Sequence, residues 1–245
     1  MTKLKTAALA ATALCAFSIA PAYARLQLSI SANGATFSCF DGELGCDLSG
    51  GANNLLTVDT AVGGAFVQIT LTQSSFGKPN ELQLSSDNIL NQSGAPITIK
   101  LLASDTNFVP PVEFIRESAS LTFNSAVGSG ASLLQFWADP LNTQGANPNN
   151  TPGALLDTVT GTPISDPDSF SGSHLTAFTA LSPFSMTEGA ALALTTGASV
   201  TGFNESMQSG IPEPRTWALL ALGFVAMALV GYKRKRPTRL TFDNA

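Results

Sequence analysis

Short runs in which apolar and polar residues alternate fill the chain between its two ends. In a strand, every second side chain points to the same face, so each run predicts a strand with one buried and one wet face. Less regular apolar runs of similar length also predict strands. The alternating runs lie at 67–71, 82–84, 97–101 and 121–123, and the less regular ones at 26–31, 55–60, 133–138, 175–181 and 191–195.

Clusters that contain glycine separate these runs and predict turns, at 63–64, 77–80, 93–94, 128–130 and 197. Many short strands with this spacing favour an all-β fold, an antiparallel β-sandwich that is jelly-roll-like. Two longer polar stretches, 139–153 and 161–174, are expected to be loops. We expect this domain to cover residues 25–208, with targeting segments 1–24 and 209–245 on either side.

The charge of the chain is unevenly distributed. Charged residues make up 12% of the sequence, about half of what is usual for soluble domains. From residue 25 to residue 210 there are fifteen acidic and four basic residues, which leaves a net charge of −11. A surface of that sign repels nucleic acid, and the sequence therefore predicts no nucleic-acid partner.

The first 24 residues have the layout of a secretory signal peptide. Lys3 and Lys5 precede an apolar stretch that is too short to span a bilayer. Ala22 and Ala24 then supply the small residues of a cleavage site, which predicts export through the Sec translocon and cleavage by signal peptidase. The alternative is an uncleaved anchor.

An uncharged apolar stretch at residues 216–232 dominates the C-terminal end. As a helix it would measure roughly 25 Å, at the short end for a membrane span. Trp217 and Tyr232 bracket it, as interfacial aromatic residues do. Because basic clusters stay in the cytoplasm, the one that follows predicts a transmembrane helix with the domain outside. That cluster consists of Lys233, Arg234, Lys235 and Arg236.

Further features stand in a fixed order around this stretch. They are Pro212, Glu213 and Pro214, then Trp217, the apolar segment with Gly223, and finally Gly231, Tyr232 and the basic cluster. In this order the tail resembles the PEP-CTERM sorting signal of Gram-negative bacteria. The resemblance covers residues 211–236, and nine further residues follow it, where such tails usually stop.

The resemblance implies processing by an exosortase, a membrane-embedded cysteine transpeptidase or protease. This enzyme would recognise Pro212, Glu213 and Pro214 at the outer membrane boundary and release the domain from the helix. The prolines remove backbone donors and favour an extended segment, which suits entry into a protease cleft. The expected path is an inner-membrane-anchored intermediate that later reaches the cell surface or is secreted. The alternative is a plain single-pass anchor in which these three residues are incidental.

Cys39 and Cys46 are the two cysteines that remain after signal removal. In an oxidising compartment such a pair predicts a disulfide that closes a short loop. Two thiols without a nearby histidine make a poor zinc site, so no metal site is predicted. Oxygen-rich loops around Asp41 and Asp166 could hold calcium, but they lack any specific ligand pattern.

His174 is the single histidine, and alone it builds neither a catalytic triad nor a histidine-rich metal site. We interpret it as a loop or strand-edge residue. No nucleophile, base and orienting group can be assembled from the sequence, so no catalytic residue, no cofactor and no enzymatic activity are predicted.

The uncharged, Ser-, Thr- and Asn-rich sandwich and its tail predict a non-enzymatic surface or extracellular-matrix protein, associated with extracellular polysaccharide or biofilm. A carbohydrate-binding module or adhesin is the alternative, and Trp137 and Phe170 are the aromatic residues nominated for its platform. A secreted hydrolase is the third hypothesis.

Overall fold

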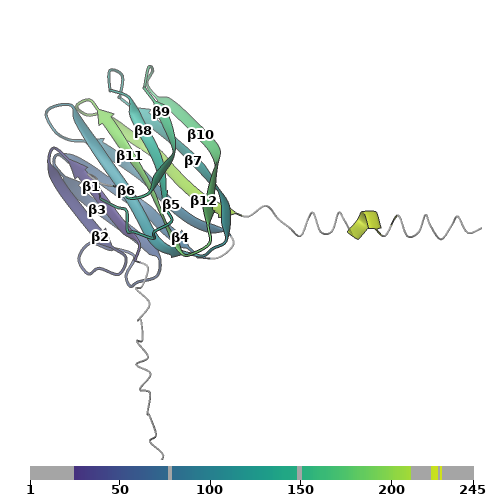
Figure 1. The fold of residues 1–245 in the computed structure, drawn as a ribbon. Helices are drawn as coiled ribbons and strands as arrows, with labels where there is room; N and C mark the ends of the chain where they lie inside the picture. Colours follow the sequence, from purple (N-terminus) through teal and green to yellow (C-terminus); the bar gives the residue numbers. More distant parts are fainter. Residues whose placement is uncertain (1–24, 77–78, 148–150, 211–221, 226, 228–245) are drawn as a thin grey trace, which may run out of the picture.

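The fold is described from a computed structural model, in which residues 25–76, 79–147, 151–210, 222–225 and 227 are described. Within these residues, twelve strands form two six-stranded antiparallel sheets (Figure 1). The strands are β1 (Gln27–Ala32), β2 (Ala35–Phe40), β3 (Leu55–Val62), β4 (Ala65–Ser75), β5 (Asn80–Asn91), β6 (Ile97–Phe108), β7 (Val112–Asn124), β8 (Ser132–Asp139), β9 (Ala154–Gly161), β10 (Asp168–Ala180), β11 (Phe184–Leu194) and β12 (Ser199–Gly210).

Sheet A has the strand order β2-β1-β6-β11-β8-β9, and sheet B has the order β10-β7-β12-β5-β4-β3. If β5 to β12 are counted from one to eight, their orders are 1-8-3-6 in sheet B and 2-7-4-5 in sheet A. This is the order of a jelly roll. The hairpins β1–β2 and β3–β4 extend the two sheets beyond it. The predicted antiparallel sandwich is therefore confirmed.

The core lies between the sheets and is built from the inward-facing half of each strand. Its largest fully buried side chains include Phe108, Phe136, Phe184 and Phe203. Along β5, buried and more exposed residues alternate from Asn80 to Asp87, which is the period that predicts a half-buried strand. The alternation sets the register of each strand, because a slip by one residue would turn its apolar side chains to water.

Two tight turns close the hairpins at the start of the chain. Asn33-Gly34 joins β1 to β2, and Gly63-Gly64 joins β3 to β4, with positive φ at all four residues. Such turns match the twist of paired strands. The turn at 63–64 was predicted, whereas Asn33-Gly34, a strong hairpin signal, was missed together with strand β2.

The predicted loop at 161–174 is wrong in its second half. Strand β10 begins at Asp168 and pairs with β7 along its length. It is an edge strand in which most side chains are exposed, so it carries Ser and Gly where an inner strand carries apolar residues. Strand β11 likewise begins at Phe184, earlier than the predicted run at 191–195. No run was predicted within β9, nor within the inner strand β12.

Both targeting segments fall largely outside the described residues. The signal peptide with Ala22 and Ala24 lies outside them, as do Pro212, Glu213, Pro214, Trp217 and the segment from Tyr232 to Arg236. Residues 222–225 and 227 are helical, and their large apolar side chains are exposed. No helix within the described ranges is both long and apolar enough to cross a bilayer. The sorting tail therefore stays a prediction.

The two hairpin turns give a matched pair of substitutions. Gly34 and Gly63 both have positive φ, but a Cβ on Gly34 meets open space while a Cβ on Gly63 meets the carbonyl of Ala32. Gly34→Ala should lower the free energy of unfolding by about 1–2 kcal/mol through the left-handed backbone alone. Gly63→Ala should lower it by about 3 kcal/mol or more, because the Ala32 carbonyl must also move. Urea unfolding measures both, and equal losses would contradict this packing.

Candidate functional site

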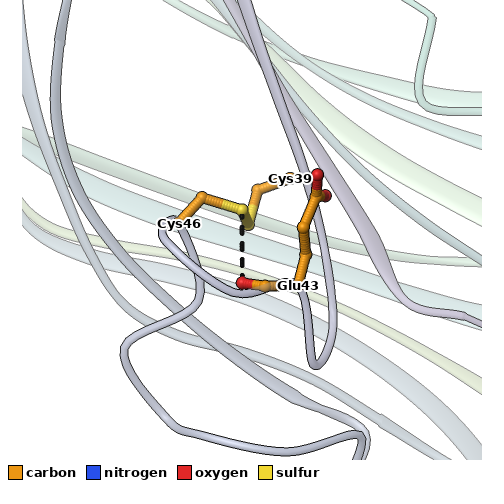
Figure 2. A group of neighbouring side chains, drawn as sticks. All are labelled: Cys39, Glu43 and Cys46. Atoms are coloured by element: carbon orange, nitrogen blue, oxygen red, sulfur yellow. Dashed lines mark hydrogen bonds between the residues drawn. A yellow bond between two sulfur atoms is a disulfide. The ribbon is translucent and has the colours of Figure 1, made fainter.

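A disulfide joins the end of β2 to the loop that follows it, as predicted. The Cα atoms of Cys39 and Cys46 are 5.9 Å apart, and Figure 2 shows the bridge with Glu43 beside it. Donor atoms of these three residues come close enough together to resemble a metal site. Both sulfurs are bonded to one another, however, and neither is a thiolate ligand. The group is therefore a covalent clamp on the loop.

Three glutamates point into the core. Glu117, Glu188 and Glu205 are each 0% exposed, and among the described residues their carboxylate oxygens find no hydrogen-bond partner of ordinary geometry. They occupy inward positions of β7, β11 and β12, where alternation would place an apolar residue. An unpaired charge at such a site is expensive, so the neutral acid is favoured.

Burial is the main reason why the pKa of each of these carboxyls is raised. For Glu188, the neighbouring Glu205 raises the pKa further, well above 4.5. For Glu205, the backbone of Gln135 opposes the rise without reversing it. Glu188 on sheet A and Glu205 on sheet B thus form a carboxyl pair inside the sandwich. The sequence offered a signal for it, an acidic residue in step with apolar ones at Phe203 and Met207, which was missed.

A fourth inward acid, Asp105 on β6, has partners. The hydroxyl of Ser74 on β4 donates to it at 2.5 Å and links the two sheets, and the amide of Thr106 donates at 2.7 Å. These bonds lower the pKa of Asp105, but burial outweighs them and raises it from 3.8 to about 6.

His174 lies on the edge strand β10, which agrees with its interpretation as a strand-edge residue. Its Nδ1 lies 2.5 Å from Oδ2 of Asp157 on β9, so the two sheets are joined at this edge. The sequence did not predict this pair. Such a bond orients an imidazole, as catalytic sites require. In the described part of the chain, no hydroxyl or thiol is hydrogen-bonded to His174, and the absence of an activity stays a prediction.

The outer face of sheet A is polar and nearly uncharged. One row across it runs Thr36, Ser31, Lys100, Ala191 and Leu133, as the pairing of β2, β1, β6, β11 and β8 shows. Ala191 and the neighbouring Gly189 on β11 have small or no side chains, so the centre of this face is recessed relative to the strands on either side. Side chains on both sides of β11 therefore stand above a shallow floor.

Three hollows lie side by side on this face and share residues. The first, about 100 Å³, is lined by Trp137, Gln135, Thr151, Lys100 and Gly189, among others. The second, about 270 Å³, shares Lys100 with it. The third, about 450 Å³, lies at the turn end of the sheet and shares Asn33 and Thr98 with the second.

We call these connected hollows the outer groove. Trp137, Gln135 and Thr151 stand at one end, Lys100 in the middle, and Asn33 and Thr98 toward the other end. Lys100 is the one charged residue that lines it among those described, although the domain as a whole is strongly acidic. The groove can therefore stack a ring on Trp137 and exchange hydrogen bonds with hydroxyl groups along its length.

Of the two aromatic residues nominated for a platform, the structure places only Trp137 on an outer face. Phe170 points between the sheets instead, where its ring packs against Phe123 with centroids 5.8 Å apart. The nomination of Phe170 is wrong because the strand extends back to Asp168, which puts Phe170 at an inward position of β10.

No family model matches the chain, and no curated protein matches it. Among solved structures, it is similar to the xylan-binding domain CBM22-1 of Xyn10C from Paenibacillus barcinonensis. The identity is 16% and the TM-score 0.27, over 62% of this chain and 86% of that one. It is also similar to the C-terminal CBM6 of LamC, a marine laminarinase from Zobellia galactanivorans, at 10% identity and a TM-score of 0.23, over 64% and 89%.

A third similar structure is the enzymatically active domain of tailspike protein 4 from bacteriophage CBA120, at 7% identity and a TM-score of 0.28. The match covers 62% of this chain, which spans only 19% of that one. All three TM-scores lie below 0.5, so none of these likenesses carries an argument about what this chain does.

The buried acids predict how stability changes with pH. A carboxyl whose pKa is raised on folding contributes its full stability below its unfolded pKa, and this is lost as the pH rises through the folded pKa. For Asp105 that window runs from about pH 4 to about pH 6. Wild type should therefore be less stable at pH 8 than at pH 4, and Asp105→Asn should remove on the order of 2–3 kcal/mol of that difference.

Urea unfolding at the two pH values measures this difference. Asp59→Asn, at an exposed position of β3, is the matched control and should leave the difference unchanged. An Asp105→Asn protein with the same pH dependence as wild type would refute the assignment.

Proposed function

We propose that this chain is an exported bacterial surface protein whose sandwich binds extracellular polysaccharide in the outer groove. One observation carries the proposal: the three hollows join Trp137 to hydroxyl and amide side chains over an extended path, and none of the described residues that line it is acidic. A sugar ring has an apolar face that packs on an aromatic ring, and hydroxyls that pair with amides. A groove several hollows long suits a chain of sugars better than one small molecule.

The proposal also gives the low charge of the domain a role. Sugar hydroxyls are neutral and exchange hydrogen bonds in both directions, as Ser, Thr, Asn and Gln side chains do. Lys100, in the middle of the groove, adds a donor that reaches an oxygen of either a neutral or an acidic sugar. The proposed role is therefore to bind carbohydrate, which is in keeping with a surface or matrix protein.

Substitution of Trp137 tests the groove. Trp137→Ala should weaken binding to a soluble polysaccharide at least about tenfold, which corresponds to about 1.4 kcal/mol. Affinity electrophoresis through gels that contain xylan, dextran, alginate or laminarin measures the retardation. Phe66→Ala is the control, because Phe66 is a half-buried aromatic on the outer face of sheet B. Equal retardation of both variants and wild type, in every gel that retards wild type, would refute the groove.

The sorting tail is the second part of the proposal. Strand β12 ends at Gly210, two residues before Pro212, so the proposed cleavage motif directly follows the folded body. An exosortase would cut there and release the sandwich from the apolar segment. The resemblance of residues 211–236 to the PEP-CTERM signal supports this part.

Pulse-chase labelling of the full-length protein in an exosortase-bearing host tests the processing. Wild type should shorten with time by about the mass of the tail, whereas Glu213→Ala should keep it, because the enzyme would read that side chain. Glu213→Gln keeps the shape of the side chain and removes its charge, so this variant shows which of the two the enzyme requires. Retention of the tail in wild type and variants alike would favour the plain anchor.

A further inference from the structure

Several loops lie at the end of the sandwich where the last strand, β12, ends at Gly210. In sheet B, Gly210 at the end of β12 lies opposite Phe114, near the start of β7. In sheet A, Asp139 at the end of β8 lies opposite Ser185, near the start of β11. The amide of Asn80 donates to the carbonyl of Val109 at 2.9 Å and brings the two sheets together here.

We call this the tail-side end. It carries the loop 41–54 after β2, the link 109–111 between β6 and β7, the loop that follows β8 from residue 140, and the turn 181–183 before β11. Figure 1 shows β12 ending at this edge of the sandwich.

Large apolar side chains stand in water on these loops. They sit on four separate segments of the tail-side end, and three of them are more than 80% exposed. The residues are Leu44 at 98%, Leu48 at 65%, Val109 at 41%, Leu141 at 84% and Leu181 at 84% exposed. At the opposite end, the described loops expose Val127 and Ile164.

A single exposed leucine is ordinary, but several on adjacent loops mark a contact surface. The chain itself indicates what covers this surface. The apolar segment of the tail begins at Thr216, six residues after Gly210, and six residues span at most about 20 Å. While that segment crosses the bilayer, the tail-side end therefore cannot move far from the membrane surface.

We infer that the tail-side end is a membrane-contacting face, which rests on the bilayer through Leu44, Leu141 and Leu181 while the chain is tethered. The inference rests on the proposed tail as a membrane tether. Apolar side chains at loop tips enter the boundary between headgroups and acyl chains, as interfacial segments do. The net charge of −11 between residues 25 and 210 makes a zwitterionic surface the favoured lipid.

The test uses the full-length chain with Cys15→Ser, reconstituted into phosphatidylcholine vesicles. Cysteine is introduced singly at Leu44, Leu141 or Leu181 and labelled with an environment-sensitive fluorophore, while Cys39 and Cys46 stay bridged. Ile164→Cys is the matched control, because Ile164 is as exposed as Leu181 but lies at the opposite end. Lipids that carry a nitroxide near the headgroup quench a probe that touches the membrane.

Quenching at the three tail-side positions should be at least twice that at Ile164. Equal quenching at both ends, or none at any position in protein that floats with the vesicles, would overturn the membrane face and leave the tether standing. Probes that shift only when exosortase is added to the vesicles would identify a protein contact and would also overturn it.

A chain that does not float with the vesicles would overturn the tether, and with it both the sorting proposal and this face. Polysaccharide binding through Trp137 is measured on the same samples in gels. We expect this binding to be the same whether or not the tail-side end touches the membrane, because Trp137 lies on the outer face of sheet A.

Discussion

The burial of two apolar sheet faces against each other is the constraint on which the other features depend. It sets the register of every strand, and it leaves the outer faces free to carry Ser, Thr, Asn and Gln. It also makes the inward glutamates unusual. Glu117, Glu188 and Glu205 occupy positions where an apolar side chain would stabilise the sandwich, and their raised pKa values tie the stability of the core to the proton concentration outside.

Most of the fold could be predicted because alternation is a local signal. The runs around Val67, Leu82 and Ile99 each fall within a strand of the structure. The signal failed mainly at sheet edges, although the edge strand β3 was predicted and no run was predicted within the inner strand β12. Strands β2 and β9 and the first half of β10 bury few side chains, so their sequences resemble those of loops. For this reason Phe170 was nominated for an outer face, although its side chain packs between the sheets.

The groove could not be predicted from sequence, since it depends on which strands are neighbours. Lys100, Gln135 and Ala191 are far apart along the chain and meet only because β11 lies between β6 and β8. The pair of Asp157 and His174 likewise joins strands of different sheets. By contrast, the disulfide joins residues close in sequence, and Cys39 and Cys46 could be paired from compartment and count alone.

The position of β12 in its sheet has a mechanical consequence. It is the last strand before the tail, yet it lies between β5 and β7 and is bonded to both. A pull along β12 is therefore shared by two ladders of hydrogen bonds, whereas a pull along an edge strand would be carried by one. If the tail is the proposed membrane tether, force on it reaches the body of the sandwich through both neighbouring strands, β5 and β7.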